Sequence, residues 1–245
     1  MWLEMKPAKR FPRLVHFFGP DGAGKSTQVD ILVGVLRERG INAQKCWVRA
    51  HHTVAFLLWR FFMRIGFCRE VLNPFGVATR IPAVDRNRFL GFFWSSVEFI
   101  GVLPHILRVY YYLWRGRTLV AERYILDTVT TIAYFLDDIS FLGSWTSRLL
   151  LRLIPRDTAF IFLDADYEAI YQRRAHLFSI RMRHKGQRRE YGAIPASSVE
   201  PRVFIDFQRR AYKTLSRLFD TLVVNTSKSS IEETSMIIRQ NLGLN

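Results

Sequence analysis

The sequence is poor in cysteine, in acidic residues and in long uncharged runs. Its two cysteines, Cys46 and Cys68, are too few for a disulfide framework and lack the spacing of a zinc site. Uncharged runs such as Phe89–Val97 and Phe99–Leu107 have nine residues each, whereas a membrane-spanning helix needs about 20 apolar residues. The charged N-terminal segment is unlike a secretory signal. We therefore expect a cytoplasmic protein without a membrane span.

Basic residues are in excess, and the excess is concentrated in one segment. The chain has 36 Lys and Arg against 21 Asp and Glu, a formal net charge of +15. Residues 173–217 hold twelve basic and three acidic residues, so this segment alone carries +9. Such a block can bind an anion, a nucleic acid or lipid headgroups, or can form a solvated helix face. The charge by itself does not choose among these functions.

The hydrophobic pattern predicts an α/β fold. Hydrophobic residues make up 49% of the 245 residues, which excludes intrinsic disorder and suits a single domain over 1–245. Short apolar runs predict five strands, at Leu14–Phe18, Ala43–Val48, Thr118–Glu122, Ala159–Leu163 and Thr221–Asn225. Helical spacing predicts helices between them, at Gly24–Arg39, Thr53–Gly66, Phe93–Trp114, Thr128–Leu136, Tyr167–Leu177, Arg202–Leu218 and Ile231–Leu242. This alternation indicates a parallel sheet with helices on both faces and ligands at the carboxyl ends of its strands.

A glycine-rich segment follows the first predicted strand. Residues 19–27, Gly-Pro-Asp-Gly-Ala-Gly-Lys-Ser-Thr, match the phosphate-binding pattern of Gly, four residues and Gly-Lys-Ser/Thr. Glycines turn backbone N–H groups toward phosphate oxygens, the following helix adds its positive end, Lys25 reaches the β- and γ-phosphates and the Ser26 hydroxyl can bind Mg²⁺. The pattern predicts that ATP is bound by Gly19, Asp21, Gly22, Ala23, Gly24, Lys25, Ser26 and Thr27.

A Mg²⁺ site also needs an acidic group at a neighbouring strand end, and the sequence offers two. Glu122 and Asp164 each end a predicted strand. Asp164 is followed by Ala165, Asp166 and then a predicted helix, so helix capping is its alternative role. Glu122 is followed by Arg123, a cation well placed to bind phosphoryl oxygens beside a metal-bound carboxylate. We therefore favour Glu122, together with Ser26, as the metal-binding pair.

Four segments of the chain carry a family resemblance. They are residues 16–28 around the glycine-rich segment, Arg49 after the second strand, the run Glu122-Arg123-Tyr124, and residues 162–174. In order and spacing they resemble the thymidylate kinase family of nucleoside-monophosphate kinases. The resemblance implies a three-layer P-loop kinase fold with a mobile, arginine-rich lid over 178–200. It also implies phosphoryl transfer from ATP to a nucleoside monophosphate.

The same resemblance assigns roles to matching residues. Lys25, Arg123 and arginines of the lid, of which we single out Arg181 and Arg188, are expected to neutralise charge on the transferred phosphoryl group. Arg49 is expected to hold the acceptor phosphate together with Arg123. These roles agree with the chemistry, because phosphoryl transfer requires positioning and electrostatic stabilisation and no nucleophilic side chain.

The acceptor is the part that the resemblance determines least. Asp21 is expected to contact the acceptor sugar. The stretch Phe93–Glu98 lacks the arginine with which thymidylate kinases read the pyrimidine, and the basic and aromatic insertion over 53–88 has no counterpart in that family. The sequence therefore predicts the type of reaction and leaves the acceptor base open.

Two other functions remain as alternatives. A P-loop kinase of a nucleoside, sugar or other small hydroxyl acceptor needs a carboxylate base, for which Asp127 is the candidate. A nucleotide-gated binder of RNA or of an anionic membrane would use the 173–217 block and the aromatic segment Val54–Arg64. That aromatic segment can also pack against the core or a dimer partner, and we expect a homodimer.

Overall fold

The computed structural model describes residues 11–48, 54–72, 78–174 and 202–244. Its centre is a five-stranded sheet in the order β2-β5-β1-β6-β7. The strands are β1 (Leu14–Phe18), β2 (Ala43–Trp47), β5 (Thr118–Arg123), β6 (Thr158–Asp164) and β7 (Thr221–Asn225). All neighbouring strands are parallel. The five predicted strands and the α/β fold class are thus confirmed.

Strand β1 occupies the centre of the sheet because all five of its residues suit a position buried on both faces. Leu14 pairs with Leu119 of β5 on one side and with Thr158 of β6 on the other. Near the other end of the strand, Phe18 pairs with Phe162. The carboxyl ends of β1, β5 and β6 therefore lie side by side at one edge.

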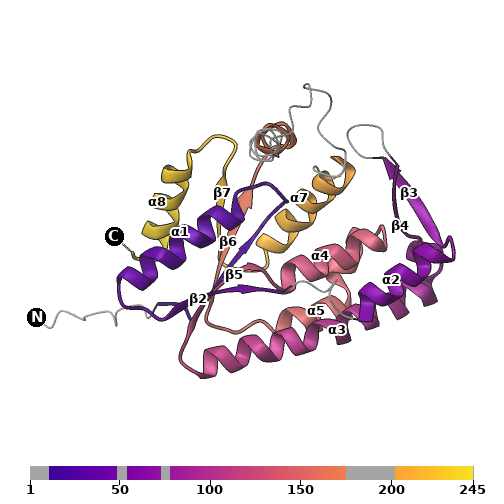
Figure 1. Ribbon diagram of the computed structural model, residues 1–245, viewed down its shortest axis with the longest axis horizontal. Helices are drawn as coiled ribbons and strands as arrows, with labels where there is room; N and C mark the ends of the chain where they lie inside the picture. The colour runs from indigo at the N-terminus through magenta and orange to yellow at the C-terminus, as the bar shows by residue number, and fades with distance from the viewer. Residues whose placement is uncertain (1–10, 49–53, 73–77, 175–201, 245) are drawn as a thin grey trace, which may run out of the picture.

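Helices cover both faces of the sheet (Figure 1). One face carries α1 (Lys25–Glu38), α8 (Ile231–Asn241) and a helix that begins at Tyr167 and continues to at least Arg174. The other face carries α3 (Arg88–Trp114), α4 (Ile125–Phe135), α5 (Trp145–Arg152) and α7 (Arg202–Ser216). Each layer has its own apolar core. This arrangement leaves the carboxyl edge of the sheet between the two helical layers.

Several elements differ from the sequence-based expectation. The 53–88 insertion contains α2 (Val54–Arg64), the antiparallel hairpin of β3 (Cys68–Leu72) and β4 (Ala78–Pro82), and a short 3-10 helix, η2 (Val84–Arg86). Another 3-10 helix, η3 (Ile139–Gly143), precedes α5. Neither η3 nor α5 was predicted from the sequence. Helix α3 begins five residues earlier than predicted, because the Asn87 side chain caps it by accepting a hydrogen bond from the Phe89 N–H.

Helix α3 bears on the expectation that the chain has no membrane span. Among the described residues, Phe89–Trp114 is one helical stretch that is long and apolar enough to cross a membrane, by length and composition alone. Glu98 and Arg108 divide this stretch into short uncharged runs, but two charges do not cancel the apolar character of the whole helix. Part of the stretch is buried inside the protein, where Val102 and Ile106 belong to the core.

Candidate functional site

A glycine-rich turn joins β1 to α1 at the carboxyl edge of the sheet. Gly19, Gly22 and Gly24 have φ angles of 145°, 94° and 92°, which side chains with a Cβ rarely adopt. Gly19 also lies against β6, because a Cβ there would be 2.1 Å from the carbonyl oxygen of Leu163. The three glycines therefore allow a tight turn that ends directly at the first residue of α1.

The same turn leaves open space at its last glycine. A Cβ on Gly22 would be 2.7 Å from the Ile170 side chain, whereas a Cβ on Gly24 would meet no atom within 4 Å. Gly24 is the N-cap of α1 and no side chain caps the helix there. The first-turn N–H groups of α1 therefore have no side-chain cap at Gly24, and together with the positive end of the helix dipole they can attract an anion.

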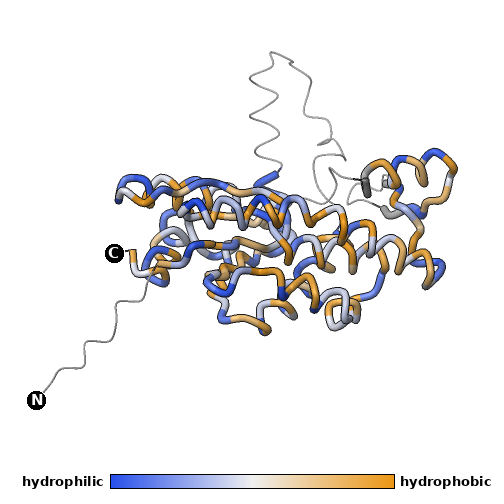
Figure 2. Tube along the Cα trace, turned by 90° about the horizontal axis from the view of Figure 1, so that it is seen from below, coloured by the Kyte–Doolittle hydropathy of each residue, from blue (hydrophilic) through white to orange (hydrophobic). Residues whose placement is uncertain are grey.

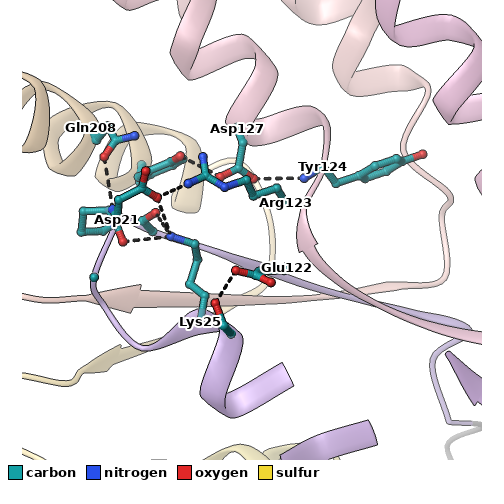
Figure 3. Close-up of polar contacts among 12 residues, drawn as sticks. Asp21, Lys25, Glu122, Arg123, Tyr124, Asp127 and Gln208 are labelled. Carbon is teal, nitrogen blue, oxygen red and sulfur yellow. Dashed lines mark hydrogen bonds and ion pairs between the residues drawn. The ribbon is translucent and has the colours of Figure 1, made fainter. Parts of the chain in front are cut away.

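Buried Lys25 and Asp21 form a charged cluster with the partly buried Arg123 beside this turn (Figure 3). The Lys25 Nζ donates hydrogen bonds to the carbonyl oxygens of Gly19 and Pro20, at 2.7 and 2.9 Å, and lies 3.4 Å from the Asp21 carboxylate. Arg123, the last residue of β5, donates from its guanidinium to the same Asp21 oxygen. One carboxylate thus holds two cations from different elements at one place.

The electrostatics of this cluster follow from its burial and its opposite charges. Burial alone would raise the pKa of Asp21, but Lys25 and Arg123 lower it well below its ordinary value. Burial lowers the pKa of Lys25 against the opposing effect of Asp21. Burial would also lower the pKa of Arg123, yet Asp21 and Asp127 raise it above its usual range. With Asp21 and Arg123 both charged, the cluster places cationic side chains beside the N-terminus of α1.

Ser26 and Glu122 form a second pair at the same edge. The Ser26 hydroxyl, in the first turn of α1, donates a hydrogen bond to the carboxylate of Glu122 in β5. A hydroxyl and a carboxylate oxygen are the hard ligands that Mg²⁺ prefers, and protein Mg²⁺ sites often use only one or two such groups together with phosphate and water. The described residues contain no group of three or more His, Cys, Asp or Glu in metal-binding reach. The Ser26–Glu122 pair therefore fits a Mg²⁺ ion that is shared with a phosphorylated ligand.

Asp164, the other candidate for the metal, has a different set of partners. The Arg209 guanidinium of α7 donates to both of its oxygens, at 2.7 and 3.0 Å. Lys213 lies 3.4 Å from the same carboxylate, and Arg209 also contacts Asp166. Asp164 thus joins β6 to α7 through a bidentate ion pair. Its side chain therefore does not cap the next helix, which was the alternative role that the sequence suggested.

Asp127 lies behind the cluster, in the first turn of α4. One of its oxygens accepts a hydrogen bond from the Tyr212 hydroxyl at 2.9 Å. The other accepts from the Tyr124 N–H at 3.1 Å and lies 3.3 Å from Nε2 of His16. Burial alone would raise the pKa of Asp127, but His16 and the nearby cations lower it. Asp127 is 4% exposed and fixes the start of α4 relative to β1 and α7.

Comparison with known proteins gives no assignment. No protein-family model matches the chain, and no curated protein matches it.

Two arginines of the basic segment lie beside the glycine-rich turn. Arg173 donates to the carbonyl and hydroxyl oxygens of Thr226 and, at 3.4 Å, to the carbonyl oxygen of Gly22. Arg174 is close enough to Asp21 to lower the pKa of that carboxyl, after the larger effects of burial, Lys25 and Arg123. The helix that carries both residues thus connects the turn to the loop after β7.

Other predicted site residues lie outside the described residues. These are Arg49 and the lid over 178–200 with Arg181 and Arg188. Ala23 is buried in the turn and Thr27 is exposed on α1. The structure brings together the rest of the predicted set, namely Gly19, Asp21, Gly22, Gly24, Lys25, Ser26, Glu122, Arg123 and Asp127.

Sequence reasoning did not find three residues that support the cluster. His16 stands in an apolar strand, where its pairing with Asp127 leaves no local signal. Gln208 accepts a hydrogen bond from the Asp21 N–H at 3.4 Å, and Tyr212 binds Asp127. Gln208 and Tyr212 are four residues apart on α7, so both lie on one helix face. This polar pair on a buried helix face is the sequence signal that could have identified Gln208 and Tyr212 as site residues.

Proposed function

We propose that this protein transfers a phosphoryl group from ATP, with Mg²⁺, to a nucleoside monophosphate. The observation that carries the proposal is the junction of the glycine-rich turn with Lys25, Asp21 and Arg123. It combines an open helix N-terminus with two cations from separate elements. Backbone donors at one side and a second cation at the other suit a phosphate chain and a phosphoryl group in transfer.

Each residue has a definite part in this reaction. Lys25 and Arg123 stabilise the charge that spreads over the transferred phosphoryl oxygens. Asp21 holds both cations in place, so little reorganisation is needed when the substrate binds. Ser26 and Glu122 would hold Mg²⁺, which neutralises phosphate charge and orients the phosphate chain when it is bound.

The surroundings of Asp127 favour a phosphate acceptor over a hydroxyl acceptor. A hydroxyl acceptor needs a base that it can reach, whereas Asp127 is 4% exposed, both of its oxygens accept hydrogen bonds and its pKa is lowered, despite burial, by His16. The phosphate of a monophosphate is already an anionic nucleophile and needs no base. The resemblance to thymidylate kinases points the same way and leaves the acceptor base open.

The experiment is an assay of ADP release with Mg²⁺, ATP and a panel of nucleoside monophosphates. At least one monophosphate is expected to raise ADP release, and Lys25→Ala is expected to reduce that release by roughly a hundredfold or more, because a cation that stabilises the transition state is lost. Counting phosphates on the product by mass spectrometry separates a diphosphate product from a newly phosphorylated hydroxyl.

The matched control is Lys45→Ala. Lys45 lies on edge strand β2 and pairs with Asp30, with about half of its side chain exposed. Its removal is expected to leave ADP release unchanged. If no monophosphate raises ADP release above the Lys25→Ala background, although circular dichroism shows a folded protein, the proposal is wrong.

A further inference from the structure

Helix α2 exposes a row of apolar side chains with arginines along its border. Leu57, Phe61 and Ile65 are spaced four residues apart and are 65%, 55% and 57% exposed. At 100° per residue they cover one face, and Arg60 and Arg64 follow directly on one side of that face. Both arginines are exposed as well. The outward side of α2 is therefore apolar in its middle and cationic along one edge.

The inward side of the same helix is already used by the protein core. Phe62 is buried, and Leu58 and Trp59 pack against the core beside it. The Phe62 ring lies 6.2 Å from the ring of Trp94 in α3. The exposed row is thus a second apolar face, which the packing of the described residues leaves uncovered.

Helix α3, which packs beside α2, continues this exposed apolar character. Its outward residues Phe93, Ile100, Leu107 and Trp114 recur every seven positions and are 43%, 63%, 68% and 79% exposed. Phe89 extends the row by one turn, so the row is about 38 Å long at 1.5 Å per residue. No charged residue stands within it. Figure 2 shows hydrophobic segments together with hydrophilic ones at the end of the molecule where α2 lies.

These two rows define the α2–α3 apolar surface, which consists of Leu57, Phe61, Ile65, Phe89, Phe93, Ile100, Leu107 and Trp114. We propose that this surface docks the protein on an anionic membrane, with α2 and α3 lying along the lipid headgroups. These eight apolar side chains are 43–79% exposed on two helices that pack together, whereas exposed apolar residues on a soluble monomer are usually scattered singly. Helices of this kind bury their apolar face at the acyl boundary and place basic side chains among anionic headgroups.

Charge favours a lipid surface over a second copy of the chain. In a symmetric dimer the same patch meets itself, so Arg60 and Arg64 of both copies would enter one interface. The whole chain carries a net charge of +15, which repels a second copy and attracts an anionic membrane. An anionic lipid surface therefore complements both the arginines and the overall charge.

The helix lies along the membrane and does not cross it. The inward face of α3, with Trp94, Val102, Val109 and Leu113, belongs to the core that covers the sheet. A spanning helix would have to leave that core and take Glu98 into the hydrocarbon, which is costly. Burial on one face and exposure on the other suit a helix at the membrane interface.

The test is co-sedimentation of the full chain with vesicles of phosphatidylcholine, alone or mixed with phosphatidylglycerol. Binding is expected only with the anionic mixture and is expected to weaken with salt. Arg60→Gln with Arg64→Gln is expected to weaken binding roughly thirtyfold, at the usual contribution of each basic residue near an anionic surface. Leu57→Ser with Phe61→Ser is expected to weaken it by at least roughly tenfold, because less apolar area enters the membrane.

Matched controls make the same changes elsewhere. Arg210→Gln with Arg217→Gln removes two exposed arginines from α7 and its C-terminal turn, and Ile231→Ser with Met236→Ser removes two exposed apolar side chains from α8. Both controls are expected to bind vesicles as the wild type does. All altered side chains are exposed, so folding is preserved in each variant and is checked by thermal melting.

Three results would overturn the proposal. One is absence of binding to the anionic vesicles. Another is an equal loss of binding in the α7 control, which would assign the effect to total charge. The third is a stable dimer in analytical ultracentrifugation that Leu57→Ser with Phe61→Ser dissociates, which would assign the surface to a second copy. Because none of these variants alters the cluster around Lys25, failure here leaves the proposed phosphoryl transfer untouched.

Discussion

Two buried carboxylates on neighbouring helices have opposite surroundings. Asp127 of α4 is 4% exposed and accepts hydrogen bonds from Tyr212 and from the Tyr124 N–H, with His16 beside it. Glu98 of α3 is 1% exposed, and neither of its oxygens has a hydrogen-bond partner in the described structure. One carboxylate belongs to a network of polar groups, and the other stands alone in an apolar layer.

The difference appears in their pKa values. His16 and nearby cations overcome burial and lower the pKa of Asp127. Burial raises the pKa of Glu98 to about 7, since nothing opposes it. The carboxyl edge of the sheet therefore stabilises charge before any ligand binds, whereas the α3 layer penalises charge. The sheet edge therefore suits the proposed phosphate site, and α3 suits the proposed apolar contact surface.

The largest expected effect on stability tests the penalty at Glu98. The unfolded carboxyl has a pKa near 4.5 and the folded one near 7, so the folded state holds its proton more tightly. Wild-type stability should therefore fall as the pH rises from about 4.5 to about 7. Glu98→Gln removes this loss, so at pH 8 the variant should be more stable by about 3 kcal/mol. Urea unfolding at several pH values measures this difference in the free energy of unfolding.

The two proteins should differ little near pH 4.5, where the Glu98 carboxyl is mostly protonated in the folded state. Glu38→Gln, an exposed change of the same kind on α1, is the control and should not alter the pH dependence. Equal pH dependence in wild type and Glu98→Gln would mean that Glu98 has polar partners or solvent access that stabilise its charged form.

A smaller effect sharpens the comparison through two tyrosines. Tyr212→Phe removes the hydroxyl that donates to Asp127, so it should lower the free energy of unfolding by about 2 kcal/mol, as for other hydrogen bonds to charged groups. The Tyr124 hydroxyl is buried without a partner in the described structure, although its backbone N–H binds Asp127. Tyr124→Phe should therefore be neutral or stabilise by about 1 kcal/mol.

Both tyrosine variants are measured by urea unfolding at pH 7. If Tyr124→Phe were as destabilising as Tyr212→Phe, the Tyr124 hydroxyl would have a partner, and the surroundings of Asp127 and Glu98 would differ less than described above.

The central strands and the glycine-rich turn were predictable because their signals are local. An apolar run such as Leu14–Phe18 suits a strand buried on both faces, and the turn residues need positive φ angles. The contacts of Asp127 and Asp164 were not predictable, because their partners Tyr212 and Arg209 lie 85 and 45 residues away. Only the packing of α7 brings these pairs together.

The insertion was predicted least well. The spacing of its apolar residues indicated α2, but the β3–β4 hairpin has no pronounced alternation, and its arginines face acidic partners that the sequence does not reveal. Arg69, for example, pairs with Asp85 and Asp137. Helix α3 was placed too late because its cap, Asn87, precedes a run of aromatic residues that gives no start signal of its own.

Calorimetric titration of an unreactive ATP analogue, in the presence of Mg²⁺, tests most directly whether the turn at Lys25 binds nucleotide. The wild type should bind the analogue, and Lys25→Ala should bind it at least roughly tenfold more weakly, because a charge-assisted contact to phosphate is lost. Equal affinities in the two proteins, or no binding by a folded wild type, would contradict the assignment of this site to phosphoryl transfer.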